Sequence, residues 1–273
     1  MKPFFSIIIP TLNEERLLPN LLNDLKKQKE KKFEVLIIDG QSKDKTTAVA
    51  KKAYGKARII ISDKRNLCHQ RNIGGQKAKG DYLVFLDADI RIYNNYLSEL
   101  KKTIDRNSYL FITTYLLPDV RDKFDIFLIQ IANYTLEIMK LANKQMAPGF
   151  NFIIYKNLFN KIGGFDERTT ISEDHELSIR IQNAGVRLNI IPKRLLKWSF
   201  RRIKKDGYLP LIYKYSIATV HSMLLGEITD KKLGYQMGGH HFLEDKDVRL
   251  NKKLASEIKK YSNMVKALFK EFF

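Results

Sequence analysis

The chain has 273 residues, of which 44% are hydrophobic, and this is enough for one large domain or two small ones. Lysine and arginine number 49 against 30 acidic residues, and the net charge of +19 favours a polyanionic partner: nucleic acid, anionic lipid headgroups or a phosphorylated substrate. The single cysteine, Cys68, excludes an intrachain disulfide, and we expect a small buried residue near a helix start.

We expect the chain neither to carry a signal peptide nor to span a membrane. Its opening stretch, MKPFFSIIIPTLNEE, turns polar too early for a signal peptide. The most apolar stretch, residues 124–142, contains Asp125, Glu137 and Lys140, so it falls short of the roughly 20 clean apolar residues that a span requires. The sequence therefore predicts a soluble, cytoplasmic protein, which would reach the inner face of the cell membrane only as a peripheral protein.

The first 120 residues alternate between short apolar runs and longer polar segments with helical spacing. The apolar runs, at 4–10, 33–39, 57–62 and 81–87, are typical of strands that are buried on both faces of a parallel sheet. The segments 14–29, 43–54 and 69–79 are expected to be helices. This alternation predicts βαβ units and an α/β fold, in which helices flank a Rossmann-like, mostly parallel sheet.

After residue 120 the pattern changes. We expect an amphipathic helix at 122–143, a strand at 150–155, a helix at 172–185 that Gly185 ends, and a strand at 186–192. From residue 193 onward the chain is basic and mostly of helical spacing. We therefore divide it into residues 1–120, residues 121–207 of the same domain, and a helical, basic C-terminal extension over 208–273.

We single out acidic residues at the ends of the first, second and fourth N-terminal strands. Glu14 comes after the first strand, Asp39 ends the second, and Asp87 and Asp89 end the fourth. Because the carboxyl ends of parallel strands face one crevice, these carboxylates would crowd there unless a cation or hydrogen-bond donors met them. A divalent ion, Mn²⁺ or Mg²⁺, together with a nucleotide would satisfy them. Taken singly, the Asp87–Asp89 triplet also fits a solvated turn.

The motifs, taken in order, carry a resemblance. SIIIPTLNEE, VLIIDGQSKDKT, RNIGGQKAKGDYLVFLDAD, GGFDE and SEDHEL follow one another within residues 4–207 and resemble the inverting glycosyltransferases of family 2, which have the GT-A fold. The resemblance implies transfer of one sugar from a nucleotide-diphosphate donor to a hydroxyl acceptor. The acceptor that it suggests is a lipid-linked molecule or a cell-envelope glycan. A UDP-sugar is the first expectation and a GDP-sugar the next. Gly40 stands where the family usually has a second aspartate, so the sequence leaves open which nucleobase of the donor the site recognises.

The resemblance also implies roles for individual residues. Asp39 would accept a hydrogen bond from the base, and Asp89 would hold the divalent ion that bridges the diphosphate. Arg71 would lie near the base or diphosphate; the alternative is a surface charge on a helix. The full set of residues implied for the nucleotide sugar is Pro10, Thr11, Asn13, Glu14, Asp39, Arg71, Asp87 and Ala88.

On the acceptor side, Glu173-Asp174 matches the acid pair of the family. The resemblance makes Asp174 the general base that takes a proton from the acceptor hydroxyl. A compatible reading is helix capping by Ser172 with acids in the first turn. Gly149 would permit a close backbone approach, and with Glu173 we assign it more weakly to the acceptor or diphosphate.

A basic segment and a glycine-rich loop complete the set. Arg201 and Arg202 would clamp the diphosphate or an acceptor phosphate, or else belong to a solvated basic face. His240 and His241 are weak candidates for extra metal ligands, and surface histidines fit that loop as well. The Q-x-x-R-W signature of processive synthases is absent from the sequence, which favours one sugar per encounter.

Other classes of function stay open at this point. The net charge would suit a nucleic-acid-binding protein, but no helix-turn-helix, RRM or zinc pattern appears, so we expect no nucleic acid partner. The basic C-terminal third would suit a peripheral membrane protein without catalysis. A nucleotidyltransferase is the nearest enzymatic rival, although PTLNEE is not the glycine-rich, lysine-containing loop that such enzymes usually carry.

Overall fold

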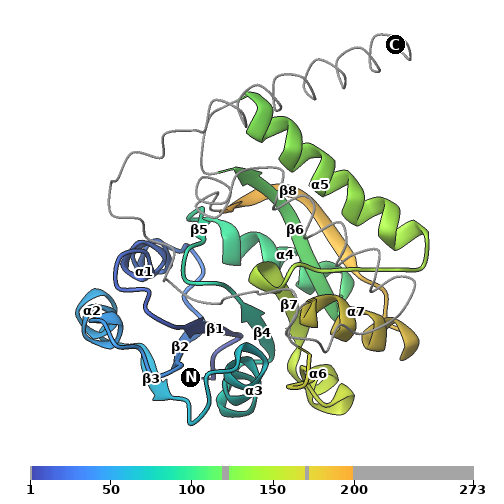
Figure 1. Ribbon diagram of the computed structural model, residues 1–273. Coiled ribbons are helices and arrows are strands. Elements are labelled where there is room, and N and C mark those ends of the chain that lie inside the picture. The colour runs from blue at the N-terminus through green and yellow to red at the C-terminus, as the bar shows by residue number, and fades with distance from the viewer. Residues whose placement is uncertain (1, 119–122, 170–171, 199–273) are drawn as a thin grey trace, which may run out of the picture. The chain divides into compact units, whose positions relative to one another are not determined.

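The computed structural model describes residues 2–118, 123–169 and 172–198 (Figure 1). The predicted C-terminal extension, 208–273, therefore lies outside the described residues, and the boundary near residue 120 stays a prediction. In chain order the elements are β1 (Phe5–Thr11), α1 (Leu18–Lys26), β2 (Phe33–Asp39), α2 (Thr46–Ala53), β3 (Arg58–Ile61), α3 (Leu67–Lys77), β4 (Tyr82–Phe85), β5 (Arg91–Ile92), α4 (Tyr96–Asn107), β6 (Phe111–Pro118), α5 (Lys123–Leu141), the 3-10 helix η1 (Gly149–Asn151), β7 (Phe152–Tyr155), α6 (Lys156–Ile162), α7 (Glu173–Asn183) and β8 (Asn189–Trp198).

Within the described ranges, eight strands form one sheet in the order β3-β2-β1-β4-β7-β6-β8-β5. β1 pairs in parallel with β2 and β4, β2 with β3, and β6 with β8, which confirms the predicted mostly parallel sheet. β7 runs antiparallel between β4 and β6, and β5 runs antiparallel to β8. The β1–β2 register ends with Thr11 beside Asp39, so two predicted site residues meet at the carboxyl edge.

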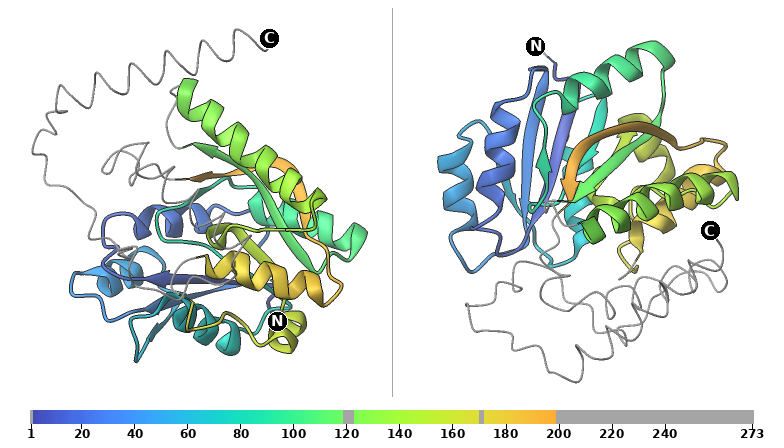
Figure 2. Two further views of the ribbon diagram at one scale, coloured as in Figure 1. Left: turned by 45° about the vertical axis from the view of Figure 1, so that its right-hand side comes forward. Right: turned by 90° about the horizontal axis from the view of Figure 1, so that it is seen from above.

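Helices cover both faces of the sheet (Figure 2). Alternate residues of the central strands face opposite layers: Ile7 and Ile9 pack toward α1, α2 and α4, whereas Ile8 packs toward α3, α6 and α7. This two-sided burial explains why the N-terminal strands are apolar along their whole length. Cys68 is buried at the start of α3, as expected.

The structure adds elements that the sequence pattern did not predict. β5, α4, β6 and α6 fall in stretches for which we made no prediction, and β8 continues to Trp198, beyond the strand expected at 186–192. The helix expected at 172–185 spans Glu173–Asn183 and is followed by Gly185 with φ +82°. Ser172 occupies the N-cap position and acids fill the first turn, as expected, but the Ser172 backbone is left-handed, with φ 63°, and its side chain makes no capping hydrogen bond.

The amphipathic helix expected at 122–143 is α5, which packs on β6. Asn133 anchors it, since its side chain accepts from the N–H of Leu116 and donates to that residue's carbonyl. Among the helices of the described ranges, none has the length and hydropathy that crossing a membrane requires.

Candidate active site

The loops after β1 and β2 brace each other around Asp39. Asp39 is buried and accepts hydrogen bonds from the Thr11 hydroxyl at 3.1 Å and from the backbone N–H and hydroxyl of Ser42 at 2.8 and 2.6 Å. Across the same gap, the N–H of Asn13 donates to the Ser42 hydroxyl and the N–H of Glu14 donates to the Thr46 hydroxyl, both at 2.8 Å. The predicted nucleoside residues Thr11, Asn13, Glu14 and Asp39 are thus brought together on a rigid edge of the sheet.

Gln70 closes this edge from α3, a role that sequence reasoning missed. Its amide donates to the carbonyls of Thr11 at 3.0 Å and Ile38 at 2.7 Å. A Cβ on Gly40 would lie 3.1 Å from the Gln70 side-chain oxygen, so an aspartate there would require Gln70 to shift. In this chain, Gly40 leaves room for the Gln70 side chain. Ser42 was likewise missed, although it lies inside one of the motifs that carry the resemblance, and Gln70 directly precedes another.

Arg71 is buried at the centre of the site. Its guanidinium donates to Glu173 at 2.6 Å and to Asp87 at 3.3 Å, and it lies 5.2 Å from the centroid of the Phe165 ring. The alternative of a surface helix charge is therefore wrong, because the side chain is only 2% exposed. Burial lowers the pKa of Arg71, but the adjacent Glu173 and Asp87 raise it above its ordinary value, so the residue is a permanent cation.

Glu173 and Asp174 begin α7 beside this cation. Burial raises the pKa of both carboxyl groups, and the charge of Asp174 raises that of Glu173 further, against the opposing effect of Arg71. Asp174 accepts hydrogen bonds from the N–H groups of Gly149 at 2.7 Å and His175 at 2.9 Å. These donors favour its ionised form at the helix N-terminus, and its raised pKa favours proton acceptance.

Gly149 makes the close backbone approach that we expected. A Cβ at this position would lie 2.8 Å from a terminal guanidinium nitrogen of Arg71, which real Cβ contacts essentially never show. The absence of a side chain lets the Gly149 N–H reach Asp174 while its Cα packs on Arg71. The hydrogen bond from Gly149 to Asp174 joins η1 to the start of α7.

Asp87 and Asp89 follow β4, with the buried Ala88 between them and both carboxylates partly exposed. No group of three or more His, Cys, Asp or Glu side chains suited to a metal occurs in the described part of the chain. An all-protein cage therefore does not fit these residues. A hard divalent ion does fit, since Mg²⁺ commonly takes one or two carboxylates and completes its shell with phosphate oxygens and water.

A family model with the description "Glycosyl transferase family 2" matches residues 6–163 of the chain. The chain belongs to this family. An uncharacterized glycosyltransferase of Haemophilus influenzae is 29% identical over 183 residues, and the match spans 64% of our chain and 61% of the relative, less than two thirds of its length. Glycosyltransferase AglE of Haloferax volcanii is 25% identical over 246 residues, 82% of our chain and 79% of AglE.

Solved structures of low identity share the fold. Staphylococcus aureus TarS 1–349 in complex with UDP-GlcNAc has a TM-score of 0.58 at 23% identity, over 73% of our chain and 58% of that chain. The mannosyltransferase PcManGT of Pyrobaculum calidifontis, in complex with GDP-Man and Mn²⁺, has a TM-score of 0.58 at 18% identity, over 80% and 65%. These likenesses establish the predicted GT-A fold for this family 2 chain.

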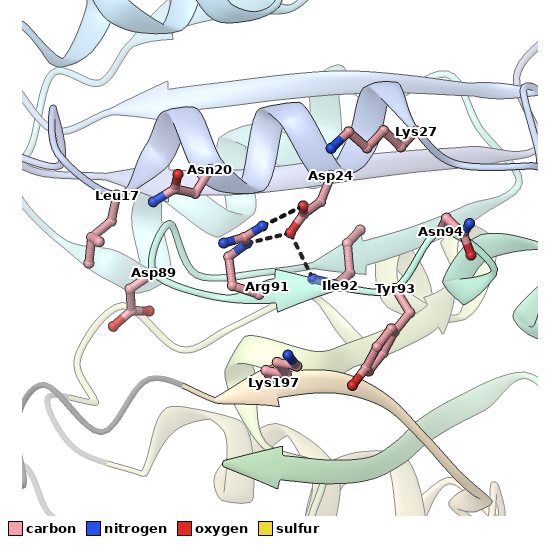
Figure 3. Close-up of a pocket in the computed structure, with 10 residues that line it drawn as sticks. All are labelled: Leu17, Asn20, Asp24, Lys27, Asp89, Arg91, Ile92, Tyr93, Asn94 and Lys197. Atoms are coloured by element: carbon pink, nitrogen blue, oxygen red, sulfur yellow. Dashed lines mark hydrogen bonds and ion pairs between the residues drawn. The ribbon is translucent and has the colours of Figure 1, made fainter. Parts of the chain in front are cut away.

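A cleft of about 480 Å³ opens beside Asp89 in this family 2 site (Figure 3). It lies between α1 and the paired strands β5 and β8, and sequence reasoning gave no sign of it because its walls are far apart in the chain. Its lining residues are Leu17, Asn20, Asp24, Lys27, Asp89, Arg91, Ile92, Tyr93, Asn94 and Lys197. The predicted site residues Arg201, Arg202, His240 and His241 lie outside the described residues.

Proposed function

We propose that this chain is a metal-dependent, inverting glycosyltransferase that moves one sugar from a nucleotide-diphosphate donor, a UDP-sugar first and a GDP-sugar next, to a hydroxyl acceptor. The supporting observation is the bridge of Arg71 between Asp87 and Glu173. It joins the carboxylates after β4, proposed to face the donor, to the acid pair that would serve the acceptor. In this proposal, the donor half and the acceptor half of the transfer site would meet at one buried cation.

The residues of the chain suggest the course of the reaction. The Thr11–Asp39 edge would receive the nucleoside, and Asp89 would hold Mn²⁺ or Mg²⁺; this ion, when bound, neutralises charge on the leaving diphosphate. An acceptor hydroxyl would attack the anomeric carbon from the face opposite the diphosphate. The bond from that carbon to the phosphate oxygen breaks, a bond to the acceptor oxygen forms with inversion, and Asp174 takes the hydroxyl proton.

The names of the relatives bear on the substrates. TarS of S. aureus, named a poly(ribitol-phosphate) beta-N-acetylglucosaminyltransferase, is 32% identical over 109 residues, 38% of our chain and 19% of TarS. Together with the UDP-GlcNAc complex of TarS and the GDP-Man and Mn²⁺ complex of PcManGT, this supports a nucleotide-sugar donor and a divalent ion for our chain. A lipid-linked or cell-envelope glycan remains the proposed acceptor.

The test is the melting temperature with UDP, GDP, CMP and dTDP, each with and without Mn²⁺. A ligand that binds only the folded state raises it by mass action. We expect one diphosphate to raise it only when the metal is present, and Asp89→Asn to abolish the rise. Asp105→Asn, at an exposed site on α4, is the matched control and should keep it. A rise that survives in Asp89→Asn would remove Asp89 from the site.

A peripheral position at the inner face of the cell membrane, otherwise in the cytoplasm, is part of the proposal. The observation that favours it is a row of exposed apolar side chains on α5 at spacings of three and four: Phe127, Ile131, Tyr134, Ile138 and Leu141. Apolar side chains on one helix face, in a chain of net charge +19, suit an anionic bilayer surface. If the protein does not pellet with anionic liposomes at low salt, this position is wrong.

A further inference from the structure

We propose that the cleft beside Asp89 binds the acceptor, and that the acceptor is a saccharide that carries a phosphate or carboxylate group. The inference rests on the proposed function, since Asp89 is the residue given there to the metal. The cleft meets the proposed donor residues only at Asp89 and otherwise has its own lining, on α1, β5 and β8 (Figure 3). It would hold the part of the acceptor away from the hydroxyl that reacts.

The floor of the cleft is held rigidly. The N–H of Tyr93 donates to the carbonyl of Leu195 at 3.1 Å, and the carbonyl of Tyr93 accepts from the amide of Gln28 at 2.8 Å. The next carbonyl, that of Asn94, accepts from the N–H of Lys29 at 2.9 Å. The Tyr93 side chain is nevertheless 40% exposed. A fixed backbone beneath an open aromatic ring is a preorganised platform, which lowers the entropy cost of binding.

The charges of the cleft leave two lysines for a ligand. Asp24 and Arg91 neutralise each other in a two-pronged pair at 2.6 and 2.8 Å, and the N–H of Ile92 donates to the same carboxylate at 3.2 Å. By contrast, no carboxylate of the described residues forms an ion pair with Lys27 or Lys197. These two lysines lie on opposite sides of β5, at the end of α1 and on β8.

The chemistry of these groups selects the class of ligand. The Lys197 ammonium lies over the Tyr93 ring, 5.4 Å from its centroid, so the cation contacts one face of an aromatic residue that is 40% exposed. A pyranose ring packs its apolar face on an aromatic side chain, and the amides of Asn20 and Asn94 can hydrogen-bond its hydroxyls. A phosphate or carboxylate on that sugar would meet Lys197, and Lys27 would add a longer-range attraction from the other side of β5. A neutral saccharide would leave both cations unused.

The experiment measures binding of hexose 1-phosphates and the matching free hexoses to the full-length protein by saturation-transfer NMR and titration, without turnover. We expect the phosphorylated sugars to bind more tightly than the free ones. Lys27→Ala and Lys197→Ala should each weaken the binding about threefold to fivefold, and Tyr93→Ala about tenfold. Lys26→Ala, at an exposed neighbour that does not line the cleft, and Tyr134→Ala, at an exposed tyrosine on α5, are the matched controls.

A second arm separates this inference from the proposed function. Tyr93→Ala should keep the metal-dependent rise in melting temperature with the nucleotide, and the nucleotide should not compete with the sugar phosphate. Competition, equal binding of free and phosphorylated sugars, or equal losses in the control variants would overturn the inference while leaving the nucleotide site intact. Farnesyl phosphosugars that bind more tightly than soluble ones would assign the anion to a lipid-linked acceptor, and equal binding would assign it to a soluble glycan.

Discussion

Replacing Arg71 with methionine should destabilise the protein by about 3 kcal/mol at neutral pH. The methionine fills much of the space but leaves Glu173 and Asp174 buried side by side without a cation. Glu173 is 11% exposed and lies 2.6 Å from Arg71, and removing one partner of a buried pair costs about 3–5 kcal/mol. We expect the lower end of this range, because the backbone N–H groups that donate to Asp174 still stabilise its charge in the variant.

The loss should depend on pH in a definite direction. An acid whose pKa is raised by folding favours the folded state most when it is protonated, below its ordinary pKa, and this contribution is lost as the pH rises through the folded value. Both acids already have raised pKa values, and removing Arg71 raises them further. The deficit of Arg71→Met should therefore shrink as the pH falls from about 7.5 toward 5.5, as measured by urea unfolding.

Two further variants decide between this account and simple loss of packing. Adding Glu173→Gln to Arg71→Met removes both charges and should recover most of the stability at neutral pH. Arg168→Met breaks a surface pair with Asp166, in which the arginine is 81% exposed, and should cost less than about 1 kcal/mol. A loss in Arg71→Met that is equally small, or that stays constant with pH, refutes the buried-charge argument.

Three more predictions follow from the same geometry. Gly149→Ala should lower kcat about tenfold or more, because its Cβ collides with the buried guanidinium, whereas Gly55→Ala, with its nearest neighbour at 3.7 Å, should have no effect. Asp174→Asn should lower kcat about 10²–10⁴-fold and keep the nucleotide-induced thermal shift, and an unchanged rate would exclude Asp174 as the base. Because burial raises the pKa of Asp174, the wild-type rate should decrease as the pH is lowered through a pKa above the ordinary value of an aspartate. The hydrogen bond to Glu167 raises the pKa of His69, so the stabilisation it gives is full below the ordinary pKa of histidine and is lost as the pH rises through the raised one. His69→Asn should therefore flatten the fall in unfolding free energy as the pH rises above the ordinary pKa of histidine, and an equal slope would contradict this.

The N-terminal half was predictable because its strands are buried on both sides. The run 33–39 coincides with β2, and the runs 4–10, 57–62 and 81–87 match β1, β3 and β4 to within two residues. Strands of this kind are apolar along their length and stand out from amphipathic helices. β5 was not predicted, because it has two residues and no periodicity to detect. β8 was predicted too short, because it carries polar residues at its exposed positions.

The candidate site was only partly predictable, for a similar reason. Motifs locate residues along the chain, so Thr11, Asp39 and Asp174 were singled out, but a motif does not say which side chains meet. The pairing of Arg71 with Glu173 joins residues 102 positions apart, and it depends on burial that a sequence of helical spacing does not reveal. The cleft beside Asp89 depends in the same way on three elements that only the fold brings together.

The antiparallel course of β7 has a consequence for how such a site can diversify. Phe152, the first residue of β7, pairs with Phe85, the last residue of β4, so the chain enters the central sheet at the edge where the parallel strands leave it. The segment that precedes β7, including Gly149, therefore reaches the site from the incoming side. Changes in the length or sequence of that segment can alter one wall without disturbing the loops after β1 and β2. The loops after β1 and β2 can therefore stay the same in evolution while the segment before β7 changes.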